Sequence, residues 1–190
     1  AFFQEMAKKY GKKPHVMYEI FNEPVGNVSW PNVVKPYSER VIKAIREIDP
    51  DNLILVGSPH WSQDVDVAAA DPIQAKNIAY TLHFYAATHK QELRNKALAA
   101  MQKGVALMVT EYGTCRADGN GGVDEASAAE WMAFMKTHQL SHLNWSVADK
   151  AEAASIMVPD AGAKGGWTDD KLTQSGKIVR EYIRNWKKKS

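Results

Sequence analysis

The chain has 190 residues, of which 45% are hydrophobic and 24% are charged, a composition typical of a globular protein with a sizeable core. Its 24 basic and 22 acidic residues leave a net charge of +2, which gives no electrostatic case for a nucleic-acid partner. The single cysteine, Cys115, excludes an internal disulfide and a thiolate zinc cluster, and the six histidines lack metal-ligand spacing, so we expect neither a metal nor a cofactor.

Five short apolar runs recur along the chain, and each is continuous rather than alternating. Continuous runs of this kind predict strands that are covered on both faces, as in a parallel sheet. The runs begin at residues 15, 52, 78, 106 and 142 and read HVMYEIF, NLILVG, IAYTLHFY, ALMVTEY and HLNWSV.

Helical patterns fill the gaps between these runs. We expect helices over residues 37–49, 90–104 and 124–138, and an amphipathic terminal helix over 173–188. Gly104 is expected as the glycine just after the second of these helices. The first residues read as the end of another helix. The predicted order is therefore a helix followed by five strand–helix units, with an interruption after the second strand.

Five parallel strands do not close a barrel, because an eight-stranded (β/α) barrel takes about 250 residues. The chain is therefore either an open doubly wound sheet or the later part of a barrel. Polar and aromatic residues decorate the carboxyl ends of all five predicted strands. An open sheet concentrates function at one switch point, whereas a barrel spreads it over every strand end. The pattern favours a partial (β/α)8 barrel.

Two glutamates lie where predicted strands stop. Glu23 lies at the end of the apolar run in VMYEIFNEP, and Glu111 lies at the end of the apolar run in ALMVTEYG. Carboxylates at the carboxyl ends of parallel strands are where barrel enzymes keep their chemistry. A facing pair of carboxyl groups is the minimum equipment for cleaving a glycosidic bond.

The other strand-end residues also suit a carbohydrate ligand. Trp61 and Trp145 offer flat apolar faces to sugar rings. Any one such side chain is more often part of the packed structure than of a binding site, but their joint occurrence at matching strand ends favours binding. The residues that suit hydrogen bonding to sugar hydroxyls are Asn22, His83, Tyr85, Lys150 and Glu152.

Five segments carry a resemblance to a known family. YEIFNEP, LILVGSPHWSQDVD, YTLHFYAATH, MVTEYGTCRADG and LNWSVADKAEAASIM resemble successive strand-end motifs of glycoside hydrolase family 5. They are most similar to its bacterial endoglucanases, which act on β-1,4-glucan. The resemblance covers Tyr10 to Trp186. It implies that residues 1–190 form the C-terminal part of a catalytic barrel domain, corresponding to strands four to eight.

The resemblance implies a retaining double displacement without a metal or cofactor. Glu111 resembles the nucleophile, and Glu23 resembles the general acid/base. Retention needs the two carboxyl groups about 5–5.5 Å apart. Glu23 must hold a proton while Glu111 is ionised, and partial burial together with the neighbouring charge of Glu111 favours this.

The resemblance also implies roles in substrate binding. Asn22 resembles the residue that holds the sugar 2-hydroxyl, and Tyr85 resembles the partner that orients the nucleophile. Trp145 resembles the platform under the sugar at the cleaved bond. The remaining implied contacts are His83 near the cleavage point, Lys150 and Glu152 one sugar further along, Trp61 on the leaving-group side, and the backbone at Ala117.

The family's first three strands have no counterpart in the chain. Without them the sheet has an uncovered edge, which is an association hazard. Three explanations stay open: a fragment, pairing with a separate N-terminal half-barrel, or association of copies through the open edges. We expect association rather than a stable, active monomer.

Three functional alternatives also remain. The chain is a cellulase portion, a family relative acting on mannan or xyloglucan, or a non-catalytic carbohydrate-binding scaffold. The polymeric substrate suggests secretion from a bacterium. The opening residues lack the pattern of a signal peptide, so the natural start is expected upstream. No apolar run reaches the roughly 18–20 residues of a membrane span.

Overall fold

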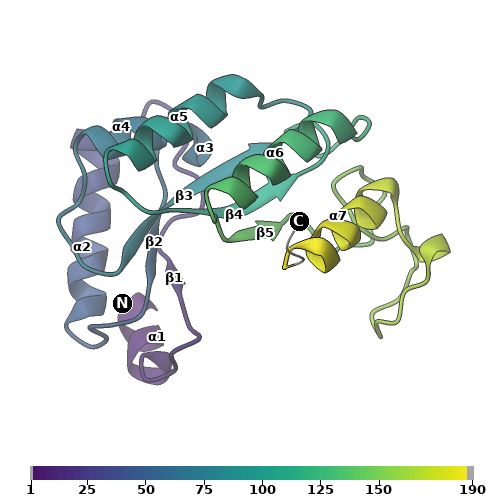
Figure 1. Cartoon of the computed structure of the whole chain (residues 1–190). Helices are drawn as coiled ribbons and strands as arrows, with labels where there is room; N and C mark the ends of the chain where they lie inside the picture. Colours follow the sequence, from purple (N-terminus) through teal and green to yellow (C-terminus); the bar gives the residue numbers. More distant parts are fainter. Residues whose placement is uncertain (1, 188–190) are drawn as a thin grey trace. The chain divides into compact units, whose positions relative to one another are not determined.

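The computed structural model describes residues 2–187, in which helices alternate with five strands (Figure 1). The strands are β1 (Tyr18–Glu19), β2 (Ile54–Val56), β3 (Ile78–Tyr85), β4 (Leu107–Gly113) and β5 (His142–Asn144). The α-helices are α1 (Phe2–Tyr10), α2 (Lys35–Arg46), α3 (Pro59–Ser62), α4 (Val65–Ala70), α5 (Gln91–Gln102), α6 (Glu125–Thr137) and α7 (Gln174–Asn185). A π-helical turn, η1 (Trp30–Val34), precedes α2, and a 3-10 turn, η2 (Asp169–Lys171), precedes α7.

All five strands belong to one sheet in the order β1-β2-β3-β4-β5. β2 pairs in parallel with β1 and with β3, so that Leu55 lies opposite both Glu19 and Ala79. β4 pairs in parallel with β5, with a register shift between Val109 and Tyr112. Parallel neighbours need a crossover connection, which the intervening helices supply. The five expected strands are confirmed, although β1 is reduced to two residues.

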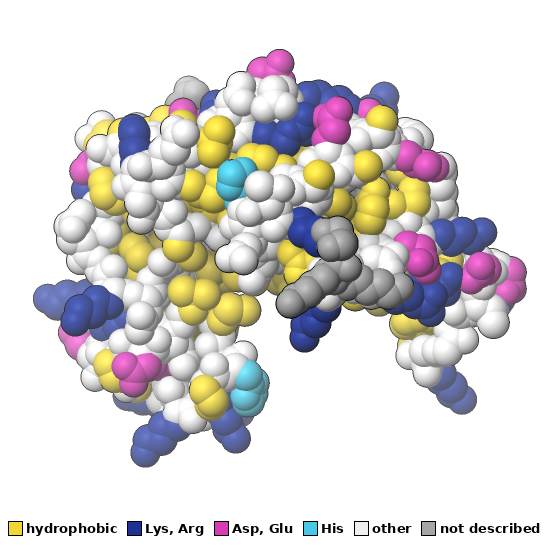
Figure 2. Space-filling model, in the orientation of Figure 1, with side chains coloured by type: hydrophobic (Ala, Val, Ile, Leu, Met, Phe, Trp, Pro, Cys, Tyr) yellow, Lys and Arg dark blue, Asp and Glu magenta, His cyan; other side chains and the backbone are white. Residues whose placement is uncertain are grey.

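The chain divides into two compact units. The first comprises Ala1–His83 and Asn95–Met108, and the second comprises Phe84–Arg94 and Val109–Ser190. Within residues 2–187, every helix is too short or too polar to span a bilayer. On the face drawn in Figure 2, basic and acidic side chains are interspersed, as the near-zero net charge predicts.

The strands of the first unit have one face lined by small and apolar side chains. Leu55, Ala79 and Met108 form a buried cluster on this face. Successive side chains of a strand point to opposite faces, so Thr81 and His83 continue the same face along β3. Both are buried, at 0% and 2% exposure. Polar groups therefore replace apolar ones toward the carboxyl end of β3.

The opposite face of β3 packs against the helical layer. The ring of Tyr80 meets that of Trp30 edge-on, with centroids 5.8 Å apart. Its hydroxyl accepts the backbone N–H of Ile73 at 2.8 Å, and the Trp30 indole N–H donates to the carbonyl of Asp71 at 2.9 Å. Tyr80 and Trp30 thus keep their polar atoms hydrogen-bonded, as burial favours.

The core of the second unit is a stack of aromatic rings. Phe84 lies parallel to Trp131 of α6, with centroids 3.8 Å apart, and stacks on Tyr112 at 5.4 Å. The Trp131 indole N–H donates to the carbonyl of His89 at 2.8 Å. Burial raises the pKa of Tyr112. These contacts hold α6 against β3 and β4.

The longer helices lie where the periodicity predicts them, but the segment after β2 differs. Gly104 has φ of +86°, which confirms it as the glycine that follows α5. α3 and α4 were not expected, because α3 contains left-handed residues that no hydrophobic period reveals. His60 and Trp61 have φ of 58° and 55°.

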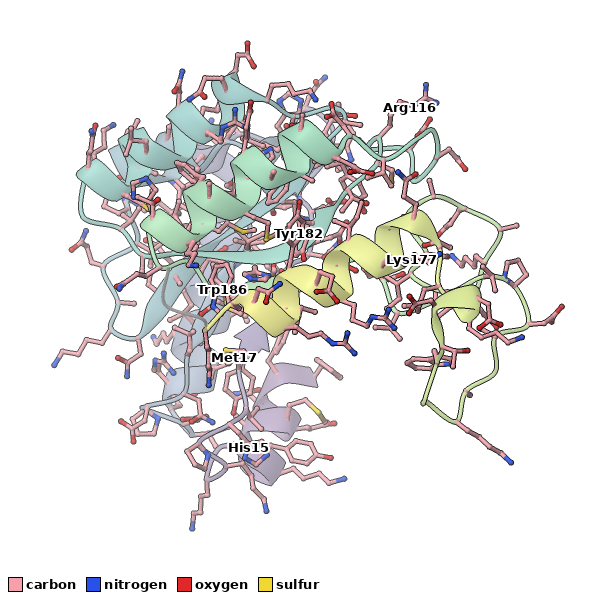
Figure 3. All side chains as sticks on the ribbon, turned by 45° about the vertical axis from the view of Figure 1, so that its right-hand side comes forward. His15, Met17, Arg116, Lys177, Tyr182 and Trp186 are labelled. Atoms are coloured by element: carbon pink, nitrogen blue, oxygen red, sulfur yellow. The ribbon has the colours of Figure 1, made fainter. Side chains whose placement is uncertain are left out.

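The terminal helix α7 is capped by Thr173, whose hydroxyl accepts the backbone N–H of Gly176 at 3.1 Å. Val179 is buried, whereas Ile183 is 59% exposed. Trp186, labelled in Figure 3 with Tyr182, meets the ring of His142 with centroids 4.3 Å apart. The end of the expected helix, at residue 188, lies outside the described residues.

A buried hydrogen bond joins β1 to the segment that follows α2. The Tyr18 hydroxyl donates to Asp49 Oδ2 at 2.6 Å, and the backbone N–H groups of Asp51 and Asn52 donate to Oδ1 at 3.1 and 3.0 Å. Burial by itself would raise the pKa of Asp49, but these three donors hold it below its ordinary value. Burial and the bond to Asp49 raise the pKa of Tyr18 to about 12.

Tyr18→Phe should lower the free energy of unfolding by about 1–3 kcal/mol, because a buried carboxylate loses a donor. The pKa of Asp49 is lower in the folded chain, so its contribution is present above about pH 4 and is lost as the pH falls through the folded-state pKa. Urea unfolding at several pH values measures both effects. The exposed control Tyr10→Phe should change little, and an equal loss in that control would contradict the prediction.

Candidate active site

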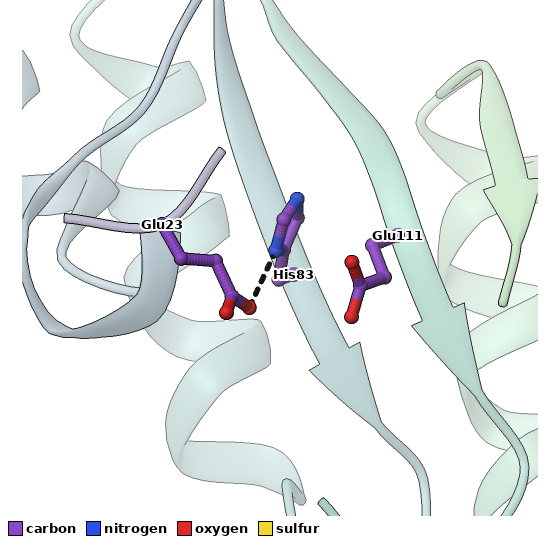
Figure 4. A group of neighbouring side chains, drawn as sticks. All are labelled: Glu23, His83 and Glu111. Atoms are coloured by element: carbon purple, nitrogen blue, oxygen red, sulfur yellow. Dashed lines mark hydrogen bonds and ion pairs between the residues drawn. The ribbon is translucent and has the colours of Figure 1, made fainter. Parts of the chain in front are cut away.

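Glu23 lies in the loop that follows β1 and is held by a buried histidine. Its Oε1 is 2.8 Å from Nδ1 of His83 on β3. The Glu23 side chain is 25% exposed, whereas that of His83 is 2% exposed. Figure 4 draws this hydrogen bond. The carboxyl group therefore reaches solvent while one of its oxygens is fixed from inside the unit.

The backbone on both sides of Glu23 is clamped by the turn after β2. The Ser62 hydroxyl donates to the carbonyl of Asn22 at 2.9 Å, and the Trp61 N–H donates to the carbonyl of Pro24 at 3.2 Å. A Cβ added at Gly57 would lie 2.6 Å from the carbonyl oxygen of Phe21, so glycine permits this close approach. The turn thereby fixes the Asn22–Pro24 segment.

Three consecutive non-glycine residues of this turn are left-handed. His60, Trp61 and Ser62 have φ of 58°, 55° and 56°. Such conformations cost on the order of 1–3 kcal/mol each and persist only where surrounding contacts hold them. Trp61 is 47% exposed in this turn, and its backbone N–H bonds to the loop that carries Glu23. The side chain of Asn22 is also exposed.

Glu111, on β4, is held by a different partner. The Tyr85 hydroxyl donates to Glu111 Oε1 at 2.7 Å. The Tyr85 backbone is anchored by the turn that follows β3: its N–H donates to Nδ1 of His89 at 2.8 Å, and its carbonyl accepts the His89 N–H at 2.8 Å. Tyr85 is 9% exposed, so its ring is largely fixed by packing.

The Tyr85 ring packs directly against the backbone of Gly113. A Cβ added at Gly113 would lie 2.3 Å from Cδ1 and 2.5 Å from Cε1 of Tyr85. Real Cβ atoms do not approach ring carbons so closely, so the ring lies against a bare backbone. The glycine of the TEYG motif is therefore needed for the Tyr85–Glu111 hydrogen bond.

The loop after β5 presents the remaining predicted residues of the second unit. Trp145 is 47% exposed, and its N–H donates to the carbonyl of Tyr112 at 2.8 Å. Lys150 Nζ is 4.0 Å from Glu152 Oε1, and these side chains are 69% and 25% exposed. This exposed lysine and half-buried carboxylate are accessible to a polar ligand.

Ala117 lies in the loop after β4. Its N–H donates to the hydroxyl of Thr88 at 2.9 Å, so this part of its backbone is already engaged within the chain. Its predicted contact with sugar stays a prediction. Nearby Cys115 is fully buried, and burial raises the pKa of its thiol.

The predicted residues therefore fall into two sets. Asn22, Glu23, Trp61 and His83 belong to the first unit, and the second unit holds the rest, which are Tyr85, Glu111, Ala117, Trp145, Lys150 and Glu152. In each set a glutamate is hydrogen-bonded to a residue of β3 that is distant from it in the sequence. His83 and Tyr85 are each hydrogen-bonded to a glutamate carboxyl group, and their predicted roles at the site stay predictions.

Sequence reasoning missed three residues that build these arrangements. Ser62 and Gly113 act through backbone contact, for which a single sequence carries no signal. Glu19 does carry one, because it is a charged residue inside an otherwise apolar run. Its Oε1 lies 3.8 Å from Nε2 of His83 and accepts the Thr81 hydroxyl at 3.4 Å.

Comparison with known proteins gives concordant matches. The family model "Cellulase (glycosyl hydrolase family 5)" matches residues 1–151. Endoglucanase Z of Dickeya dadantii is 57% identical over 185 residues, which cover 97% of this chain and 41% of that protein. This chain thus spans well under half the length of that relative.

Solved structures agree with the sequence matches. A structure from Cytophaga hutchinsonii is 55% identical with a TM-score of 0.94, over 96% of this chain and 60% of that one. The catalytic domain of Thermobifida fusca endoglucanase Cel5A in complex with cellotetraose is 34% identical with a TM-score of 0.89, over 96% and 62%. The expected fold class, five parallel strands and helices of a partial (β/α)8 barrel, is confirmed.

Gly113→Ala should lower the free energy of unfolding by about 1–3 kcal/mol, because the new methyl overlaps the Tyr85 ring and forces it to move. Chemical denaturation measures the loss, and near-UV circular dichroism reports the displaced tyrosine. Gly122→Ala is the matched control, because its Cβ would meet no atom within 4 Å. Equal stability of the two variants would contradict the assigned role of Gly113.

Proposed function

Because this chain belongs to glycoside hydrolase family 5, we propose that it carries the catalytic glutamates of an endo-β-1,4-glucanase that cleaves internal bonds of cellulose. One observation carries the proposal. Each of two strand-end glutamates has a fixed carboxyl oxygen and a partly exposed side chain, Glu23 on His83 and Glu111 on Tyr85. Glycoside hydrolysis uses a pair of such carboxyl groups.

In the first step, Glu111 is the nucleophile. One of its oxygens attacks the anomeric carbon while the glycosidic C–O bond breaks and Glu23 gives its proton to the leaving oxygen. The product is a glycosyl ester on Glu111. The Tyr85 hydroxyl donates to Oε1 of Glu111 and so orients the carboxylate for attack.

In the second step, Glu23 acts as a base. Its carboxylate takes a proton from water, the water oxygen attacks the anomeric carbon, and the ester bond to Glu111 breaks. Both glutamates return to their starting states, and two inversions give net retention. The mechanism requires the carboxyl groups about 5–5.5 Å apart.

The exposed residues supply substrate binding in this proposal. Trp145 and Trp61, each 47% exposed, offer ring faces to the apolar side of sugar rings. Asn22 holds the 2-hydroxyl of the sugar at the cleaved bond, near His83. Lys150 and Glu152 hydrogen-bond the next sugar, and the backbone at Ala117 supplies a further contact.

Glucan is favoured over mannan and xyloglucan as the substrate. The Thermobifida fusca relative is described in complex with cellotetraose, a β-1,4-glucan fragment. Hydrolysis of manno-oligosaccharides in preference to cello-oligosaccharides would reverse this choice. Cellulose is a polymer outside the cell, so we also propose a secreted, bacterial enzyme.

The chain is also proposed to associate through the ends of its sheet. β1 and β5 are the outer strands in the sheet order of the described residues. Met17 and Phe21 beside β1 are each 46% exposed, and Leu143 of β5 is 52% exposed. An apolar groove of about 390 Å³, which Phe21 and Tyr37 help to line, adds to the surface beside β1. Exposed apolar side chains at a strand edge invite pairing with a second copy or with an N-terminal half-barrel.

Glu111→Gln should reduce the release of reducing sugar from carboxymethyl cellulose on the order of a thousandfold or more, because the nucleophile is lost. The assay is run on the 190-residue chain and on a fusion in which the early barrel strands of a relative precede it. Glu92→Gln, an exposed change on α5, is the matched control and should keep full activity.

Glu23→Gln separates the two roles. It should abolish cleavage of cellulose but spare the first step on an aryl cellobioside whose leaving group needs no proton. Activity of Glu111→Gln equal to the control would sink the catalytic assignment. Binding of cello-oligosaccharides without turnover in the fusion would favour the non-catalytic scaffold instead.

Sedimentation velocity should show a mass that rises with concentration, because open strand edges associate. Met17→Lys should weaken this association, since a charge at a strand edge disfavours pairing. Val67→Lys, an exposed change on α4, is the control. A single monomeric species at all concentrations would contradict the association.

A further inference from the structure

We propose that Glu19 is a positioning residue that sets the proton arrangement of His83 and thereby holds Glu23 in its acid form. The inference rests on the proposed function, in which Glu23 gives a proton to the leaving oxygen. It assigns a task to a carboxylate that neither the strand-end pattern nor the two-glutamate mechanism uses.

His83 lies between two carboxyl groups of the first unit. Its Nδ1 is 2.8 Å from Glu23 Oε1, and its Nε2 is 3.8 Å from Glu19 Oε1. The imidazole is 2% exposed, so neighbouring protein groups, these two carboxyl groups among them, rather than water decide where its proton resides. The Glu19 and Glu23 side chains are 30% and 25% exposed.

The strand register explains how Glu19 reaches the ring. Glu19 lies opposite Leu55, which lies opposite Ala79 of β3. Side chains two residues apart share a face of a strand, so His83 stands on the same face as Ala79. Glu19 therefore approaches the ring from β1, while Glu23 approaches it from the loop that β1 enters.

A neutral imidazole carries one N–H and one lone pair. When Oε1 of Glu23 carries the proton, it can donate to Nδ1 only if Nδ1 presents its lone pair. The ring proton then resides on Nε2, directed toward Glu19. At 3.8 Å the Glu19 oxygen is beyond normal hydrogen-bond length, but its charge still attracts the N–H of the buried ring.

The opposite tautomer would disfavour the first step. An N–H on Nδ1 would donate to Glu23 and favour its ionised form, which has no proton to give. With Nε2–H, the Nδ1 lone pair faces an anionic oxygen only after Glu23 has lost its proton. That repulsion favours return of a proton from the attacking water in the second step. Glu111, the other carboxyl group of the proposed site, is then held as a neutral ester.

Nuclear magnetic resonance of the ¹⁵N-histidine-labelled chain tests the inference. Long-range ¹H–¹⁵N correlations distinguish the two neutral tautomers from the imidazolium, and the spectrum of His83→Gln identifies the His83 signals. At about pH 6 the unsubstituted chain should show the Nε2–H tautomer. Glu19→Gln should move the tautomer ratio about tenfold toward Nδ1–H, because the attracting charge is removed.

Two further variants serve as controls. Thr81→Val removes the hydroxyl that contacts Glu19 but keeps the Glu19 charge, so it should leave the tautomer ratio near that of the unsubstituted chain. Glu19→Asp, which keeps the charge, should restore most of the Nε2–H population. In the active fusion, Glu19→Gln should lower kcat on cellulose about tenfold with KM little changed, because substrate contacts are intact.

The outcomes separate cleanly. The Nδ1–H tautomer or an imidazolium in the unsubstituted chain overturns the inference, as does an unchanged ratio in Glu19→Gln. If Glu19→Gln does not fold, the tautomer of the unsubstituted chain still decides. Nε2–H without any Glu111-dependent hydrolysis overturns the proposed function and leaves the Glu19–His83 arrangement standing. Hydrolysis that needs both Glu23 and Glu111, with the wrong tautomer, overturns only the role of Glu19.

Discussion

Parallel pairing of short strands is the constraint on which the rest of the structure depends. A parallel neighbour can be reached only by a crossover, so every strand is followed by helical chain before the next begins. The loops that leave the carboxyl ends are therefore free to carry polar residues, while β2 and most of β3 and β4 are buried. Glu23 follows β1 and Glu111 lies near the end of β4 for this reason.

Each glutamate is then fixed by a group that comes from another part of the chain. His83 is 60 residues from Glu23, and Tyr85 is 26 residues from Glu111. Both partners belong to β3, where two residues of separation keep side chains on one face. A single strand thus supplies a hydrogen-bonding nitrogen for one carboxyl group and a hydroxyl donor for the other.

Close backbone packing makes these polar contacts possible. Neither Gly57 nor Gly113 has room for a Cβ. A Cβ added at Gly57 would lie 2.6 Å from the carbonyl oxygen of Phe21, and one added at Gly113 would lie 2.3 Å from the ring of Tyr85. The left-handed turn at His60 and Trp61 adds two donors on either side of Glu23 through Ser62 and the Trp61 N–H. Left-handed backbone and glycines in close contact are thus concentrated beside the proposed catalytic glutamates, where surrounding contacts stabilise the strained turn.

The sequence by itself determined where the strands and the main helices form and that two glutamates lie at the ends of apolar runs. Continuous apolar runs are a local property, and so is the place where such a run stops at Asn22–Glu23 or Thr110–Glu111. Only the tertiary structure decided which groups meet. The pairing of Glu23 with His83, the place of Glu19 opposite Leu55 and the need for glycine at position 113 depend on register and on packing distances of a few ångströms. Those quantities arise between residues far apart in the chain, and no local pattern encodes them.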